Sequence, residues 1–180
     1  MPWVSGGSGG GGLAKLFDST LSGAAASIDS GAGGFSTSFD LLQIFIIART
    51  AEAVVFSTLA IVLNNDTGLN YDYTLVQNRN TTVTGAVVAA DTKWGTVVPG
   101  ASAAASYCAV VRVDVPGYGQ TTFFKTGVMV SGDPNSAAAS EDINARALAW
   151  RNTAAINRVA ISVQGGPNLV AGSRLLIYGT

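Results

Sequence analysis

The stretch from residue 59 to residue 77 constrains the fold of this chain more than any other. It begins with an apolar run, Leu59-Ala60-Ile61-Val62-Leu63, which stops at Asn64-Asn65-Asp66-Thr67-Gly68 before an aromatic-bearing run starts at Leu69. Apolar runs separated by Asn, Asp and Gly are typical of a strand, a tight turn and a second strand. We therefore predict a β-hairpin, with asparagines tolerating left-handed backbone angles and Gly68 supplying a positive φ in its turn.

The pattern recurs along the chain and predicts an all-β fold. Residues 107–115 alternate between apolar and polar, as a half-exposed strand does. Residues 41–48 are apolar on both faces, which indicates a central strand covered on both sides. We expect loops at 78–102, with one or two weak strands, and at 136–146. Further strands are expected at 13–17, 24–28, 121–130, 148–152, 156–163 and 174–178, with no convincing long helix.

Eight to ten short strands at hairpin-like spacing predict a two-sheet antiparallel sandwich, with a jelly roll as the favoured topology. An immunoglobulin-like sandwich is the alternative, but the chain lacks the paired cysteines around a tryptophan that would support it. At 180 residues the chain suits one domain, which we place at 13–180. Residues 1–12 are rich in glycine and form a flexible arm, unless they are an engineered linker.

Charge is scarce in this chain. Charged residues make up 12% of it and hydrophobic residues 48%, whereas ordinary soluble domains are about 25% charged. Such a surface favours contacts with other subunits. A net charge of −1 and scattered basic residues argue against nucleic-acid binding. No apolar run is long enough for a membrane-spanning helix, and the N-terminus does not resemble a signal peptide. We therefore expect no membrane partner and synthesis in a cytoplasm.

Catalytic constellations are missing from the sequence. The chain contains no histidine and one cysteine, which excludes histidine-based triads and the usual zinc sites. We expect Cys108 to be a small buried residue, the alternative being a reactive thiol. Paired carboxylates could hydrolyse glycosides, but nothing in the sequence places two across a cleft. We therefore expect no enzyme and no cofactor. The carboxylates considered are Glu52, Asp66, Asp72, Asp114, Glu141 and Asp142.

Candidate binding residues are few. Oxygen-bearing side chains at 64, 65, 66 and 70 could suit calcium, but turn chemistry explains them, so no metal is expected. Trp94 and Tyr118 are expected on loops, where they could stack on a sugar or fill a subunit interface. Trp150 is expected to pack against the sheet. At the tip of the arm, Trp3 with Val4 is a candidate anchor on a partner.

The order of these pieces resembles that of small β-sandwich virion proteins of tailed bacteriophages. The resemblance covers roughly residues 13–179 and excludes the glycine-rich arm. Its most specific segment is Asn64-Asn65-Asp66-Thr67-Gly68-Leu69-Asn70-Tyr71. The other matching segments are Leu13-Ala14-Lys15-Leu16-Phe17, Phe39-Asp40-Leu41-Leu42-Gln43-Ile44, Leu59-Ala60-Ile61-Val62-Leu63, Trp150-Arg151-Asn152-Thr153-Ala154-Ala155-Ile156 and Gly172-Ser173-Arg174-Leu175-Leu176-Ile177-Tyr178-Gly179.

This resemblance implies a non-enzymatic structural role in a virion. The expected function is that of a capsid decoration (cement) protein, a homotrimer on the outer capsid surface that binds the major capsid protein. The alternative is the head domain of a tail fibre, which would bind a receptor or a host-surface glycan. No motif of such fibre heads allows a receptor-binding residue to be assigned in this chain.

Overall fold

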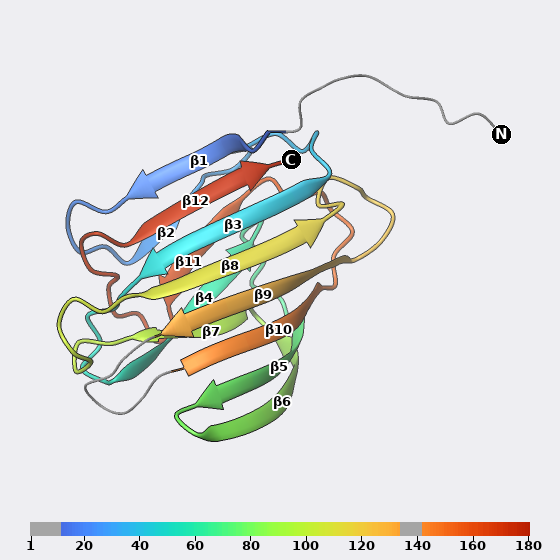
Figure 1. Cartoon of the computed structure of the whole chain (residues 1–180). Helices are drawn as coiled ribbons and strands as arrows, with labels where there is room; N and C mark the ends of the chain where they lie inside the picture. Colours follow the sequence, from blue (N-terminus) through green and yellow to red (C-terminus); the bar gives the residue numbers. More distant parts are fainter. Residues whose placement is uncertain (1–11, 134–141) are drawn as a thin grey trace.

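The computed structural model describes residues 12–133 and 142–180. The regular secondary structure in these ranges consists of β-strands alone. Twelve strands form an eight-stranded and a four-stranded sheet, each antiparallel throughout, packed as two layers (Figure 1). The predicted two-sheet antiparallel sandwich is therefore confirmed, and the jelly-roll topology stays a prediction. The predicted arm lies outside the described residues, apart from Gly12.

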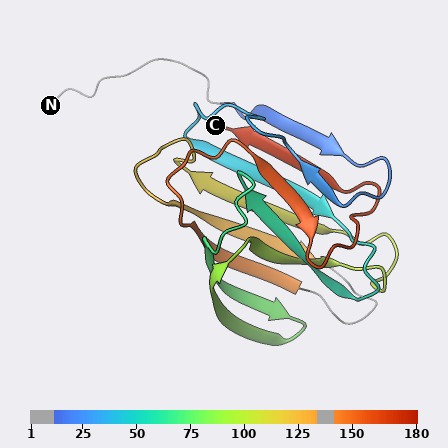
Figure 2. The same ribbon diagram turned by 180° about the vertical axis from the view of Figure 1, so that it is seen from behind.

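The larger sheet has the strand order β1-β12-β3-β8-β9-β10-β5-β6 and the smaller sheet the order β2-β11-β4-β7. Figure 2 shows the smaller sheet in front of the larger one, with β5 and β6 extending beyond it. In the larger sheet the bounds are β1 (Ala14–Thr20), β12 (Arg174–Gly179), β3 (Leu41–Ala48), β8 (Ala109–Pro116), β9 (Lys125–Asp133), β10 (Asp142–Trp150), β5 (Tyr71–Arg79) and β6 (Thr82–Asp91). Those of the smaller sheet are β2 (Ser27–Asp29), β11 (Val159–Val163), β4 (Phe56–Leu63) and β7 (Trp94–Pro99).

The core lies between the two sheets and is built from alternate residues of each strand. On β8 the predicted alternation is confirmed, because every second residue from Ala109 to Val115 is fully buried. The last strand, β12, lies inside the sheet between β1 and β3, also as predicted. The strands facing them contribute Leu59, Ile61 and Leu63 from β4 and Val159, Ile161 and Val163 from β11.

Strand β3 is central in the sheet, as predicted, but it is covered on one side only. Leu42, Ile44 and Ile46 are fully buried in the core. On the opposite face Phe45 is half-buried, with its ring against the ring of Tyr178 at a centroid distance of 5.9 Å. The prediction of cover on both sides was therefore wrong. Neighbouring side chains of the same sheet shield the outer apolar residues, and no second layer is needed.

The predicted hairpin over residues 59–77 was also wrong. Both strands exist, but β4 pairs with β7 and β11 in the smaller sheet, and β5 pairs with β10 and β6 in the larger one. Asn64 and Asn65 adopt positive φ, at 50° and 57°, whereas Gly68 is not among the described residues with positive φ. Crowding explains this glycine, since a Cβ there would lie 2.8 Å from Asn70 Nδ2. The turn carries the chain from one sheet to the other.

Three further expectations are corrected by the structure. Residues 78–102 are not mainly a loop, because β6 and β7 occupy most of them. Residues 142–146 belong to β10, and 134–141 lie outside the described residues. Residues 121–124 precede β9 as a loop, although the sequence predicted a strand from 121. Threonine, valine and alanine alone do not separate strands from loops, because those residues form strands only when a neighbour pairs with them.

Candidate interaction surface

The outer face of the larger sheet is the most distinctive surface among the described residues. Along β9 and β10, every second side chain points away from the core. Val128 and Val130 are 54% and 51% exposed on β9, and Ile143 is 57% exposed on β10. Strand pairing aligns Val128 with Ala147 and Val130 with Ala145, and aligns Val76 of β5 with Ala145. These residues form one continuous apolar strip across three strands, which we call the outer strip.

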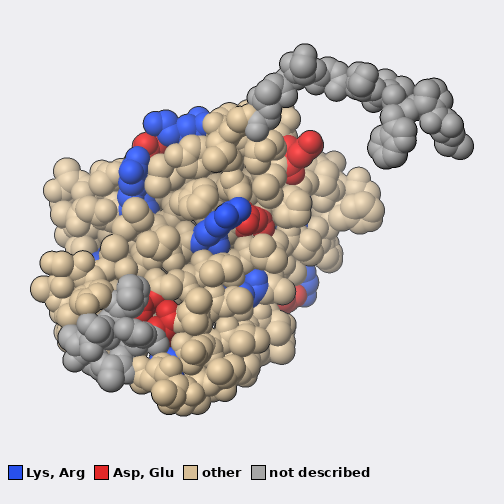
Figure 3. All heavy atoms as spheres, viewed as in Figure 1, with Lys and Arg blue, Asp and Glu red and all other residues tan. Residues whose placement is uncertain are grey.

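The outer strip carries no charged side chain on β9 or β10. Its outward-facing residues there are Thr126, Val128, Val130 and Gly132, and Ile143, Ala145, Ala147 and Ala149. Figure 3 shows that Lys, Arg, Asp and Glu are sparse on this face of the molecule. Large exposed apolar patches are uncommon on monomeric proteins and indicate interaction sites. The scarcity of charged residues in the sequence thus leaves this surface without charge and suited to contact with another protein.

One ion pair borders the outer strip on the neighbouring strand β8, and another lies at the end of the strip where β5 begins. On β8 the Arg112 guanidinium lies 3.0 Å from the Asp114 carboxylate, and Arg151 lies 2.9 Å from Asp72 at the start of β5. Between these ion pairs the small side chains of β10 leave an open hollow. It is lined by Thr74, Leu75, Val76, Val128, Met129, Val130, Ala145, Arg146 and Ala147. An apolar centre with a polar rim is the usual anatomy of a protein–protein interface.

Two phenylalanines project from the loop that joins β8 to β9. Phe123 is 72% exposed and Phe124 is 54% exposed. The loop is held in place by Gln120, whose side-chain oxygen accepts hydrogen bonds from the backbone N–H groups of Thr122 and Phe123, at 2.6 and 2.8 Å. Exposed aromatic residues on an ordered loop are typical interface anchors. Both residues were predicted to lie in a strand, so the sequence did not mark them as exposed loop residues.

Lys125 fixes the base of the same loop from within the protein. Its side chain is 1% exposed, and its ammonium group donates to the backbone carbonyls of Phe123 and Thr153, at 3.2 and 3.0 Å. Burial lowers the pKa of Lys125. A buried cation that bonds to two carbonyls tethers the backbone of the aromatic loop to the segment after β10.

The aromatic residues predicted as sugar-binding or interface candidates are buried. Trp94 is 0% exposed on β7 and donates its indole N–H to the carbonyl of Ala149, at 3.0 Å. Tyr118 is also 0% exposed and donates to the carbonyl of Ser36, at 2.6 Å, and burial raises its pKa. Neither ring can stack on a sugar or meet another subunit in this structure. Trp3 and Val4 lie outside the described residues.

The turn after β4 is a hydrogen-bonded junction between the sheets. Asp66 accepts hydrogen bonds from the Trp150 indole, from the Asn70 amide and from the Gly68 backbone, at 2.7, 2.9 and 2.8 Å. Trp150 is fully buried, so its predicted packing is confirmed. The hydroxyl of Tyr71 accepts from the Leu63 N–H at 2.9 Å. The carboxylate oxygens of Asp66, considered above as calcium ligands, thus accept hydrogen bonds within the chain and help to hold β4 against β5.

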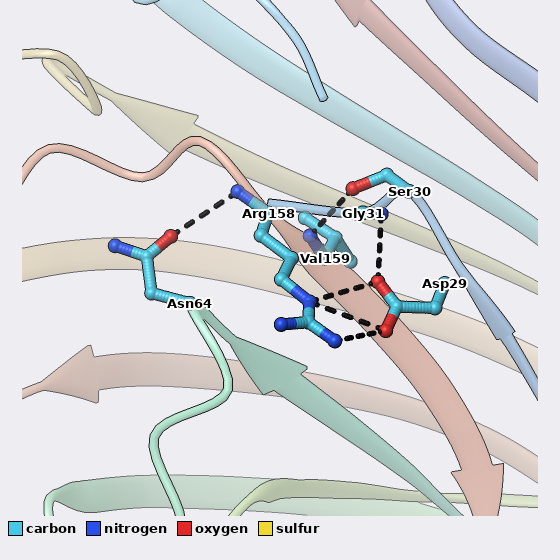
Figure 4. A network of polar contacts seen from close by, with 6 residues as sticks. All are labelled: Asp29, Ser30, Gly31, Asn64, Arg158 and Val159. Atoms are coloured by element: carbon cyan, nitrogen blue, oxygen red, sulfur yellow. Dashed lines mark hydrogen bonds and ion pairs between the residues drawn. The ribbon is translucent and has the colours of Figure 1, made fainter. Parts of the chain in front are cut away.

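A second network ties the same turn to the segment before β11. Asn64 accepts hydrogen bonds from the backbone N–H groups of Asn157 and Arg158, at 3.0 and 3.1 Å. The Arg158 guanidinium in turn binds Asp29 of β2, as Figure 4 shows, with Nε at 3.0 Å from Oδ1. The ion pair lowers the pKa of Asp29. Asn64 thus has a structural role, because both ends of its side chain bond to backbone.

A buried polar cluster lies on the core-facing side of β9 and β10. Asp142 accepts hydrogen bonds from Arg79 and Asn144, at 2.8 and 2.7 Å. Asp133, its neighbour across the strand pair, is 2% exposed and accepts no hydrogen bond from the described residues. Burial and the nearby charge of Asp142 raise the pKa of Asp133 to about 6. Nothing in the sequence marks Asp133, because its environment is created by the pairing of β9 with β10.

The other candidate carboxylates are held in separate local contacts. Glu52 accepts from the Ser57 hydroxyl at 2.6 Å, while Asp72 and Asp114 are in the two border ion pairs. Glu141 lies outside the described residues. Cys108 is exposed, so the prediction that it is buried was wrong. Its position just before β8 takes it out of the alternating part of that strand. In the described ranges there is no group of three or more acidic or cysteine side chains placed to hold a metal ion.

Comparison with known proteins adds no assignment. No family model, curated protein or solved structure matches this chain. The described residues also contain no helix that is long and apolar enough to span a membrane.

Proposed function

We propose that this chain is a non-enzymatic structural protein of a virion, acting as a capsid decoration protein that binds the major capsid protein. The single observation that carries the proposal is the outer strip, an apolar surface with no charged side chain on β9 or β10. The resemblance of the sequence to β-sandwich virion proteins supplies the kind of assembly. The expected location is the outer surface of the capsid.

The chemistry of the outer strip suits a large, permanent contact. Burying an apolar surface contributes about 25 cal/mol per Å², whereas burying unpaired charges costs several kcal/mol per ion. A strip without charged residues on β9 and β10 therefore gains from burial without that cost. Phe123 and Phe124 add two exposed aromatic side chains on the loop before β9, with 72% and 54% of their surface still exposed. A decoration protein needs such a face, because it must stay bound through the lifetime of the particle.

The tail-fibre alternative lacks comparable support. It depended on Trp94 and Tyr118 as rings for sugar stacking, and both are fully buried. Paired carboxylates for glycoside hydrolysis also lack support, because the neighbouring Asp133 and Asp142 are both buried.

The proposal is tested on purified virions whose genome encodes this chain. A decoration protein should be present in hundreds of copies per particle, as measured by quantitative mass spectrometry against the major capsid protein. A copy number of about a dozen would place the chain in a fibre and overturn the proposal. Undecorated capsids should also bind the purified chain in a sedimentation assay.

The binding face is tested by two matched substitutions. Ala145→Lys places a charge at the centre of the outer strip, and Leu69→Lys places the same charge on a residue that is 61% exposed in the turn before β5. We expect Ala145→Lys to reduce capsid occupancy at least about tenfold, since it would bury an unpaired charge, and Leu69→Lys to leave it unchanged. Equal capsid occupancy for Ala145→Lys and the unsubstituted chain would remove the outer strip from the mechanism.

Deletion of residues 1–12 tests the arm. This deletion should lower capsid occupancy if Trp3 and Val4 anchor the chain on the capsid.

A further inference from the structure

The two sheets have four edges in the described structure, and β6 is the one that lacks a blocking feature over most of its length: its pairing with β5 is regular from Thr82 to Val88, and a bulge follows only at its end. Edge strands expose unpaired N–H and C=O groups, so proteins protect them with charges, prolines, short length or cover. Strand β1 carries Lys15 and Asp18, which form an ion pair. Strand β2 has three residues, and β7 is mostly buried and ends at Pro99. Strand β6 has ten residues, with no charge or proline from Thr82 to Ala90.

The β5–β6 hairpin extends beyond the smaller sheet, so both faces of β6 meet solvent (Figure 2). Every residue of β6 is exposed or half-buried. Two of its valines are the most exposed large apolar side chains in the strands of the larger sheet, with Val83 at 68% and Val87 at 74%. A long, uncharged and apolar edge of this kind acts as a template for another strand.

We propose that β6 pairs antiparallel with β6 of a second copy of this chain, about a two-fold axis at Gly85. This register places Val83 of one copy opposite Val87 of the other, on both sides of the axis. Two eight-stranded sheets then become one continuous sheet, and the outer strips of the two copies lie on the same face of it. Cross-strand pairs of β-branched residues stabilise such a ladder.

The chemistry of the edge favours a second copy over another strand. An isologous two-fold contact requires a strip that is complementary to itself. The edge of β6 from Thr82 to Ala90 meets this requirement, because antiparallel pairing of two copies brings no like charges together. Pairing of β6 with the opposite edge, β1, would instead place Lys15 and Asp18 against valine and threonine, and would build an open chain of molecules. Residues 82–90 of β6 also offer no counter-charge to a charged partner.

This inference is independent of the proposed virion role, because it concerns the chain alone in solution. It predicts a dimer, or a larger assembly with an even number of chains. The trimer expected from the resemblance has no two-fold contact of this kind. The mass of the purified chain therefore distinguishes the two assemblies directly.

Charge substitutions at the axis test the pairing. The variant Val83→Lys/Val87→Lys should be a monomer, with self-association at least about tenfold weaker, because lysines of the two copies face each other. The variant Val83→Glu/Val87→Glu should also be a monomer. An equimolar mixture of the two should restore the dimer, since lysine then faces glutamate in any antiparallel register near the axis. Light scattering and sedimentation velocity measure the mass, and circular dichroism confirms that each variant is folded.

The control is Leu69→Lys, which adds one exposed lysine away from β6 and should keep the dimer. Three results would overturn the proposal: an unsubstituted chain that stays monomeric at high concentration, a mass of three chains, or lysine and glutamate variants that keep the mass of the unsubstituted chain. A mixture that stays monomeric would also overturn it, because opposite charges across a real β6 contact must attract. Loss of capsid binding with an intact dimer would count against the proposed function alone.

Discussion

Trp150, at the end of β10, donates its indole N–H to the Oδ2 atom of Asp66 at 2.7 Å. The residues are 84 positions apart in the sequence, and the bond joins the larger sheet to the turn that follows β4. The most specific part of the family resemblance, residues 64–71, is thus the part of the chain that ties the two layers together. Asn64, Asp66 and Asn70 of this segment all make side-chain hydrogen bonds within the chain.

The Asp66–Trp150 bond should contribute measurably to stability. Asp66→Ala removes a carboxylate that accepts three different donors, and we expect it to lower the free energy of unfolding by about 2–3 kcal/mol. Trp150→Phe should cost about 2 kcal/mol through the lost bond and lost volume. In urea denaturation, the double variant should show a coupling energy of about 1 kcal/mol or more. Asp40→Ala, at an exposed position, is the control and should change stability by less than about 0.5 kcal/mol.

The same bond predicts a loss of stability in acid. Burial acts to raise the pKa of Asp66, but the hydrogen bonds from Asn70, Gly68 and Trp150 outweigh it and lower the pKa below 3.8. The stabilisation by Asp66 is therefore complete above pH 3.8, and it disappears as the pH falls through the lowered pKa of the folded state. Asp66→Ala should lose this part of the acid sensitivity. A coupling energy near zero at pH 7 would show that the bond is not formed in solution.

Asp133 predicts the opposite pH dependence. Its pKa in the folded protein is about 6, above the ordinary value of 3.8, because it is buried beside Asp142. The folded state thus holds the proton of Asp133 more tightly than the unfolded state does. This contribution to stability is fully present below pH 3.8 and is lost as the pH rises through about 6. Asp133→Asn should remove the dependence and raise the free energy of unfolding at pH 8 by about 1–3 kcal/mol.

Urea denaturation at pH 5 and pH 8 measures this effect. The unsubstituted chain should lose stability between these pH values relative to Asp133→Asn. The matched control is Asp114→Asn, which removes a carboxylate from the outer face of the neighbouring strand β8, and it should keep the loss. If Asp133→Asn and the unsubstituted chain lose stability in parallel from pH 5 to pH 8, the carboxyl of Asp133 is not the group that titrates.

A glycine next to the aromatic loop should be intolerant of any side chain. A Cβ at Gly119 would collide with the backbone carbonyl of Thr37, whereas a Cβ at Gly132 on β9 would meet no atom within 4 Å. We expect Gly119→Ala to cost about 1–3 kcal/mol, since neither backbone segment can yield easily. Gly132→Ala should be neutral or slightly stabilising. Thermal unfolding compares the two variants, and equal transition temperatures would contradict the predicted collision.

The positions of most strands were predictable from the sequence, because alternation and turn residues are local properties. The pattern at residues 107–115 identified β8 and its buried face, and the apolar run at 41–48 identified a central strand. The scarcity of charge predicted an exterior suited to contact. The site was less predictable: the sequence did not indicate that Val128, Val130, Ala145 and Ala147 form one strip, since β9 and β10 align only through pairing.

Tertiary structure alone decided which sheet each strand joins and which aromatic rings are exposed. Trp94 and Tyr118 became buried, and Phe123 and Phe124 became exposed, because burial depends on the layer that lies opposite and on the course of the loop. The chain after Leu63 crosses to the other sheet because Tyr71 and Trp150 bond to the turn from the far layer. Local patterns specify a strand and its two faces. Its neighbours are chosen by contacts between segments that lie far apart in the chain, and so is the environment of a carboxyl group such as that of Asp133.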